Sequence, residues 1–224
     1  METKAELIKE IRQEKIIAII RGVAKQDLPH LLDALATGGI KMAEITFDQT
    51  GKTTDEETAA SIADMKAHMR GRMHIGAGTV MTVGQAEQAM NAGAEFLISP
   101  NVNPEVIRYT VANGCVSIPG AMTPTEAAMA YDSGADFVKI FPADTLGLPY
   151  LKALMAPLAH IPFLAVGGVN EENIGDFLSA GLAGVGIGSS LTPKRLIAEG
   201  KFDEIAELAG RYSKTVHTVC KTNT

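Results

Sequence analysis

The chain has 224 residues, of which 46% are hydrophobic, and this is enough to bury the core of one large domain. Its formal net charge of −6 argues against a nucleic-acid partner or an anionic membrane partner. Its only two cysteines, Cys115 and Cys220, lie far apart and form neither a disulfide framework nor a zinc motif, so we expect a cytoplasmic protein.

The first segment, residues 1–15, is rich in charged residues and its apolar side chains recur at helical spacing. We therefore predict a helix there rather than a signal peptide. The apolar runs that follow have only the length of strands, so no membrane span is expected.

Apolar segments of strand length and amphipathic helices then alternate to the end of the chain, and a glycine closes most of the helices. The expected strands cover residues 15–22, 41–47, 73–80, 96–100, 116–121, 137–143, 162–169 and 184–191. The expected helices cover residues 27–39, 55–69 and about 150–157, segments that close at Gly93, Gly114, Gly134 and Gly181, and a last segment from Phe202.

This alternation is typical of a parallel sheet covered by helices, and eight strand–helix units predict an α/β protein with a closed (β/α)8 TIM barrel. The first segment would be an extra N-terminal helix. An open doubly wound sheet is the alternative, but its phosphate-binding glycines would follow the first strand, whereas here they come late in the chain. Because no linker divides residues 1–224, we predict a single domain.

Lys139 lies in the middle of the apolar segment FVKIFPA, which we predict to be a buried strand. Side chains alternate along a strand, so Lys139 shares a face with Phe137 and Phe141. Burial lowers the pKa of an ammonium group and increases the fraction of neutral, nucleophilic amine. The structural alternative is a lysine whose charge reaches solvent or pairs with a carboxylate.

Glu44 is equally unusual, because it lies inside another predicted strand on the face of Met42 and Thr46. The interior of a small barrel is narrow, so the side chains of Glu44 and Lys139 can approach each other from opposite strands. A structural ion pair is the alternative. Such a pair stabilises little, because its desolvation costs several kcal/mol, roughly what the attraction returns. The two buried charges therefore favour a function.

Four further residues lie at or near the ends of predicted strands, where the active sites of barrels are found: Arg21, Thr79, Pro100 and Ser117. The guanidinium of Arg21 could hold a substrate carboxylate through two hydrogen bonds, or it could be an ordinary surface group. Thr79 and Ser117 could each be a strand residue that only satisfies its own hydroxyl.

The last two predicted strands end in small residues, Gly167 and Gly168 in one and Gly186, Gly188 and Ser189 in the other. Glycines let backbone N–H groups approach an anion, and a helix N-terminus adds a favourable dipole. In barrels, the loops after strands 7 and 8 are the usual phosphate site. The alternative is that these glycines only form turns.

The sequence gives little indication of a metal-binding site or of a nucleophilic cysteine. The residues His30, His74, His160 and His217 are scattered without ligand spacing, so we expect no metal site. Cys115 has no evident histidine partner, and we expect it to pack as a small apolar side chain.

The sequence resembles the 2-keto-3-deoxy-6-phosphogluconate and 4-hydroxy-2-oxoglutarate aldolase family, class I lyases on a (β/α)8 barrel. The resemblance runs from about residue 16 to residue 191 and rests on the motifs IIAIIRG, GGIKMAEIT, GAGTV, ISPN, IPGAMTPTEA, VKIFPA, AVGGV and IGSSL, in the family's order.

The resemblance implies that Lys139 forms a Schiff base and that Glu44 shuttles protons. It also implies that Thr79 and Pro100 line the site, and that a phosphate is bound by Gly167, Gly168, Gly188 and Ser189. No metal or organic cofactor would be required. The molecular partners would be a phosphorylated keto acid and pyruvate, and the assembly would be a homotrimer.

The sequence departs from the family after the second predicted strand. Asp48, in EITFDQTGK, stands near the place where the gluconate enzymes have an arginine that contacts the substrate. Arg21 resembles the arginine of the related 6-phosphogalactonate aldolases. We therefore expect Arg21 to face the site and Asp48 to point away from it.

Together these observations predict an aldolase that cleaves a 2-keto-3-deoxy-6-phospho sugar acid, or 4-hydroxy-2-oxoglutarate. The products would be pyruvate and an aldehyde, glyceraldehyde 3-phosphate or glyoxylate. One alternative is a phosphosugar isomerase or epimerase that uses Glu44 as its base. The other is a non-catalytic phosphosugar-binding protein.

Overall fold

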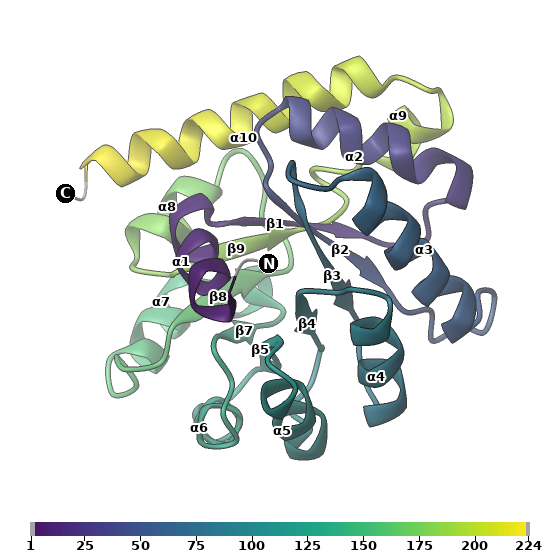
Figure 1. The fold of residues 1–224 in the computed structure, drawn as a ribbon. Helices are drawn as coiled ribbons and strands as arrows, with labels where there is room; N and C mark the ends of the chain where they lie inside the picture. Colours follow the sequence, from purple (N-terminus) through teal and green to yellow (C-terminus); the bar gives the residue numbers. More distant parts are fainter. Residues whose placement is uncertain (1–2, 223–224) are drawn as a thin grey trace.

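The computed structural model describes residues 3–222, within which nine strands form one parallel sheet in the order β5-β4-β3-β2-β1-β9-β8-β7-β6 (Figure 1). The strands are β1 (Ile16–Ile20), β2 (Met42–Thr46), β3 (His74–Gly78), β4 (Phe96–Ile98), β5 (Val116–Ile118), β6 (Gly120–Ala121), β7 (Val138–Ile140), β8 (Phe163–Val166) and β9 (Gly184–Ile187).

The barrel closes at Pro119, which separates β5 from β6. These two strands are the ends of the strand order, yet they are consecutive pieces of one segment, residues 116–121. Proline has no N–H to donate to a strand ladder, so the ladder is interrupted there, while the Pro119 carbonyl accepts a hydrogen bond of 2.8 Å from the Lys139 N–H. The TIM barrel is therefore confirmed, with the fifth predicted strand split in two.

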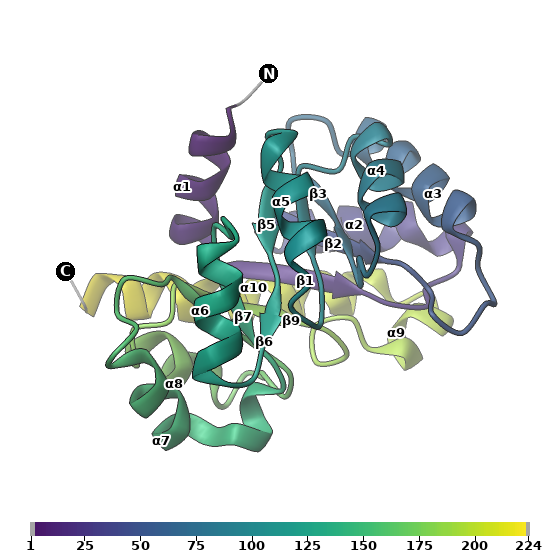
Figure 2. The same cartoon turned by 90° about the horizontal axis from the view of Figure 1, so that it is seen from below.

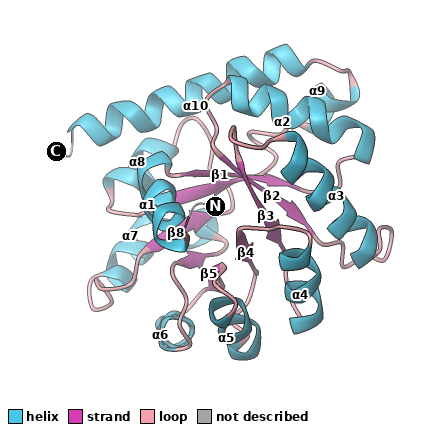
Figure 3. Ribbon diagram, viewed as in Figure 1, coloured by secondary structure: helices cyan, strands magenta, loops and turns pink. Residues whose placement is uncertain are grey.

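Helices surround the strands (Figure 3). They are α1 (Lys4–Glu14), the short 3-10 helix η1 (Lys25–Asp27), α2 (Leu28–Thr37), α3 (Asp55–His68), α4 (Val83–Asn91), α5 (Pro104–Ala112), α6 (Pro124–Asp132), α7 (Ala143–Met155), α8 (Ile174–Ser179), α9 (Lys194–Ala198) and α10 (Phe202–Thr222).

Two helices differ from the prediction. α7 begins at Ala143 rather than near residue 150, and it is kinked at Gly147, whose φ of 74° lies outside the helical region. That kink interrupts the apolar periodicity, so the sequence pattern indicates only the second half of the helix. The five-residue α9 was not predicted, because it is too short to show a periodicity.

The predicted N-terminal helix is present as α1, and it covers the end of the barrel at which the strands begin. Thr3 and Glu6 form a capping box at its first turn. Its buried residues, Leu7 and Ile11, belong to the same apolar cluster as Ile17 of β1 and Phe137. In Figure 2, α1 stands apart from the other helices, and β5 is among the strands that it contacts.

The long α10 packs along α2 and α8 on the outside of the barrel (Figure 1). Among the described residues 3–222, no helix is both long enough and apolar enough to cross a membrane.

Candidate active site

A cavity of about 340 Å³ opens at the carboxyl ends of the strands. Ten of the eleven residues that the sequence analysis selected for the site line it: Arg21, Glu44, Thr79, Pro100, Lys139, Gly167, Gly168, Gly186, Gly188 and Ser189. They lie in or just after β1, β2, β3, β4, β7, β8 and β9, so the closed sheet brings together residues that are far apart in the sequence.

The exception is Ser117, which the structure does not place at this cavity. Its neighbours Val116 and Ile118 belong to the apolar cluster inside the barrel. Because side chains alternate along a strand, Ser117 is directed toward the surrounding helices instead. We therefore remove Ser117 from the candidate substrate-binding residues.

Lys139 lies in the middle of β7 and is only 6% exposed. Its Nζ lies 5.0 Å from the centre of the Phe141 ring, a residue of the cavity wall that the sequence analysis had not selected. Burial lowers the pKa of Lys139, and the positive charge of Arg21 lowers it further, whereas Glu44 acts in the opposite direction. The environment therefore favours the neutral amine.

Glu44, in the middle of β2, is only 2% exposed, and its Oε2 has no hydrogen-bond partner among the described residues. Burial raises its pKa to about 7, against the opposing charges of Lys139 and Arg21. A carboxyl group with a pKa near the working pH can both accept and return a proton.

Gly78, at the end of β3, supports the Glu44 carboxylate and was missed by the sequence analysis as a site residue. A Cβ atom at this position would lie 2.5 Å from Glu44 Cδ and 2.7 Å from each carboxylate oxygen. The Glu44 side chain therefore needs a glycine beside it. The second glycine of the GAGTV motif, which is Gly78, is the signal that could have indicated this close approach.

Arg21 and Thr79 are joined at the wall of the cavity. Arg21 Nη2 donates a hydrogen bond of 3.1 Å to Thr79 Oγ1. Thr79 has a φ of 57°, in the left-handed region that a β-branched residue rarely occupies. Strained residues of this kind cluster at functional sites. The expectation that Arg21 faces the site agrees with this geometry.

Asp48 is not among the residues that line this cavity. Its carboxylate accepts hydrogen bonds from the N–H groups of Thr50, Lys52 and Thr53, at 2.9, 2.8 and 3.0 Å, and also from the Thr50 hydroxyl. These bonds lower the pKa of Asp48 to about 2. Asp48 therefore organises the loop after β2 and points away from the cavity, as expected.

The loops after β8 and β9 form the glycine-rich part of the wall. Gly167 and Gly168 have φ values of 97° and 69°, and a side chain at position 168 would collide with Asp144. A Cβ at Gly186 would lie 2.8 Å from Val166 Cγ2. Ser190 also lines the cavity but was not selected from the sequence. These small residues leave space and backbone groups for an anion.

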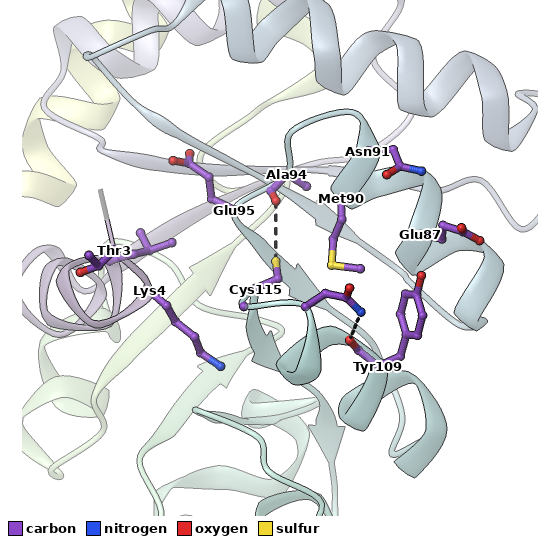
Figure 4. A pocket seen from close by; sticks show the side chains of 12 residues that line it. Thr3, Lys4, Glu87, Met90, Asn91, Ala94, Glu95, Tyr109 and Cys115 are labelled. Carbon is purple, nitrogen blue, oxygen red and sulfur yellow. Dashed lines mark hydrogen bonds between the residues drawn. The ribbon is translucent and has the colours of Figure 1, made fainter. Parts of the chain in front are cut away.

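A second cavity, of about 380 Å³, lies near the N-terminus and contains Cys115 (Figure 4). The Cys115 thiol is 6% exposed and donates to the Ala94 carbonyl at 3.6 Å. Burial raises the pKa of this thiol to about 12, so it carries no reactive thiolate at neutral pH. The prediction that Cys115 packs as a small apolar side chain is confirmed.

Comparison with known proteins shows which family this chain resembles. Residues 7–208 match the model of the KDPG and KHG aldolase family. The chain is 37% identical to a probable 2-dehydro-3-deoxy-6-phosphogalactonate aldolase of Rhizobium meliloti, over 80% of this chain and 82% of that one. It is 33% identical to the 2-dehydro-3-deoxy-phosphogluconate aldolase of Treponema pallidum, over 89% and 92% of the two chains.

Among solved structures, the KDPG aldolase of Legionella pneumophila, with pyruvate captured as a covalent carbinolamine intermediate, superimposes with a TM-score of 0.81. It is 28% identical, and the match covers 93% of this chain and 97% of that one.

Proposed function

Because this chain belongs to the KDPG and KHG aldolase family, we propose that it cleaves a 2-keto-3-deoxy-6-phospho sugar acid through a Schiff base on Lys139. The observation that carries the proposal is the pair of buried ionisable groups in one cavity. Lys139 has a lowered pKa and Glu44 has a pKa of about 7. Such opposite shifts suit a nucleophilic amine and a proton carrier.

The reaction begins when the neutral amine of Lys139 attacks the C2 carbonyl, and loss of water gives an iminium ion. Glu44 accepts the proton of the C4 hydroxyl as the C3–C4 bond breaks, and the bonding electrons pass to the iminium. An aldehyde leaves, and the enamine of pyruvate remains on the lysine. Return of a proton to C3 and hydrolysis of the iminium then release pyruvate and restore the free amine.

The walls of the cavity supply the charges that such a substrate needs. Arg21, held by Thr79, would bind the substrate carboxylate, since an ionised carboxylate is costly to bury without a cation. The glycine-rich loops with Gly168 and Ser189 would receive the phosphate at the other end of the substrate. These loops favour a phosphorylated sugar acid over 4-hydroxy-2-oxoglutarate, which has no phosphate.

Borohydride reduction in the presence of pyruvate tests the mechanism. We expect an irreversible carboxyethyl adduct on Lys139, found by peptide mass spectrometry. An isomerase or epimerase that used only Glu44, or a silent sugar-binding protein, would give no adduct. Absence of the adduct in folded protein would therefore refute the Schiff base. Cleavage of the gluconate and galactonate isomers, compared by kcat/KM, would then identify the preferred sugar acid.

The homotrimer and the cytoplasmic location remain predictions from the sequence and the family resemblance. Light scattering coupled to size-exclusion chromatography would test the assembly, and a mass near that of one chain would contradict the homotrimer.

A further inference from the structure

A third cavity, of about 650 Å³, lies at the end of the barrel where the strands begin, opposite the Lys139 site. It is bordered by the C-terminal ends of α1, α7 and α8 and by the turn that leads into β9. Residues at or just after the ends of all three helices line this one cavity. Nothing in the proposed aldol reaction uses this end of the barrel.

The charge of this cavity is opposite to that of the molecule. Arg12, Lys15, Lys152 and His160 line it, and none of its lining residues is an aspartate or glutamate. The whole chain, by contrast, has a net charge of −6. Within the described part of the chain, Arg12, Lys15 and Lys152 form no ion pair, so none of the carboxylates described there lies within 4.0 Å of these cations.

Compensation of helix dipoles does not account for this charge. Each helix C-terminus carries roughly half a negative charge, so the three that border the cavity together contribute about −1.5. Arg12, Lys15 and Lys152 contribute three positive charges, twice that amount. A cationic excess therefore remains in the cavity.

The cations are also held in place. The Arg12 guanidinium lies over the Phe137 ring, 5.3 Å from its centre, and a stacked guanidinium keeps its N–H groups available at its edge. Lys15 is fixed in the left-handed region with a φ of 62°, and its Nζ donates to the Ala183 carbonyl at 3.4 Å. Two of the three cations are therefore positioned before any ligand arrives.

From these features we propose that the cavity is a second binding site, for a small phosphorylated anion held by Arg12, Lys15 and Lys152. Arginine and lysine together suit the oxygen atoms of a phosphate group. The apolar side chains of Met155, Phe163 and Leu178 line the same cavity and give an organic part of the ligand a surface to contact. The site is independent of the aldol chemistry, because it shares no lining residue with the Lys139 cavity.

Met155 provides a local probe, because it lines this cavity and no methionine lines the Lys139 cavity. The full-length protein would be labelled with [¹³C-methyl]methionine, the Met155 signal assigned with Met155→Leu, and inorganic pyrophosphate added as the ligand. We expect a saturable shift of the Met155 methyl signal in the millimolar range or below. Arg12→Gln and Lys152→Gln should each weaken binding at least tenfold, since each removes a charge-assisted hydrogen bond.

Lys9→Gln is the matched control, because Lys9 is exposed on α1, carries the same charge and does not line the cavity. It should bind pyrophosphate like the wild type. The proposal is overturned if Met155 does not respond, if neither cavity variant weakens binding, or if Lys9→Gln weakens it equally. If Arg12→Gln loses its fold through the Phe137 contact, the exposed Lys152→Gln variant still decides the matter.

Discussion

Replacing Gly78 with alanine should slow aldol cleavage by moving the Glu44 carboxylate, although no reactive group is removed. The new Cβ would lie 2.5 Å from Glu44 Cδ, whereas carbon atoms in contact are separated by about 3.5 Å. The carboxylate must therefore move by about 1 Å. A misplacement of about 1 Å can cost about 10²-fold in rate, so we expect kcat to fall by about that factor.

The assay would follow pyruvate release with lactate dehydrogenase, beside borohydride trapping of pyruvate on the same protein. Trapping should survive in Gly78→Ala better than turnover does, because forming the pyruvate iminium breaks no C–C bond. Gly84→Ala is the control, since its Cβ would meet only Thr82 Oγ1 at an ordinary distance of 3.8 Å. Circular dichroism and thermal unfolding would show whether both variants keep the fold.

A double-mutant cycle separates displacement of Glu44 from a general disturbance of β3. Glu44→Asp shortens the side chain by one methylene and makes room for the new Cβ, so Gly78→Ala should cost less in that background than in the wild type. Equal costs of Gly78→Ala in the two backgrounds would refute displacement of Glu44 as the cause. Turnover of Gly78→Ala within about fivefold of wild type would also refute it, because a loss of about 10²-fold is expected.

Three further predictions concern the reactive and binding groups. Lys139→Met should abolish cleavage while thermal stability holds or rises, because an apolar side chain replaces a buried charge; near-native cleavage would exclude the Schiff base. Glu44→Gln should reduce kcat by about 10²–10⁴. In the wild type, kcat/KM should increase as the pH rises through about 7, because the ionised carboxylate is the form that accepts the proton. This increase should disappear in Glu44→Gln, because glutamine does not titrate. A variant within a few-fold of wild type would make Glu44 structural. Arg21→Ala should raise KM for the keto acid by roughly tenfold to a hundredfold, and Asp48→Ala by much less; equal effects, or a bound carboxylate held only by backbone amides, would contradict the role of Arg21.

The effect of pH on stability runs in the opposite direction to its effect on kcat/KM. Burial raises the pKa of Glu44 in the folded protein above its ordinary value of 4.5 to about 7, so the folded state holds this proton more tightly than the unfolded state does. The contribution of Glu44 to the free energy of unfolding is fully present below about pH 4.5 and is lost as the pH rises through about 7.

The sequence predicts the barrel and most of the site because both follow from local patterns. Alternation within a strand places Lys139 with Phe137, and Glu44 with Met42, on the interior face. Ser117 shows where this reasoning stops. Its strand is buried on both faces, since one faces the interior and the other the helices, so a two-residue period does not indicate which side is which.

The role of Gly78 could not be predicted for a different reason. It depends on the register of β2 against β3 and on the conformation of one long side chain, and neither is encoded locally. The break at Pro119 is visible in the sequence as a residue without an N–H, but that this residue closes the barrel appears only once both neighbouring strands are in place.

The arrangement of Glu44 and Lys139 explains how two opposite charges can share a buried site and remain reactive. A direct ion pair would hold the lysine in its charged form, which is not nucleophilic. Here Glu44 Oε2 has no hydrogen-bond partner among the described residues, and burial dominates the pKa of both groups. Burial raises the pKa of the acid to about 7 and lowers that of the amine, so both groups have a larger uncharged fraction than they would have in water. The neutral lysine is the form that attacks the carbonyl, and a carboxyl group with a pKa of about 7 is ionised in part at neutral pH, so it can accept the hydroxyl proton and later return it.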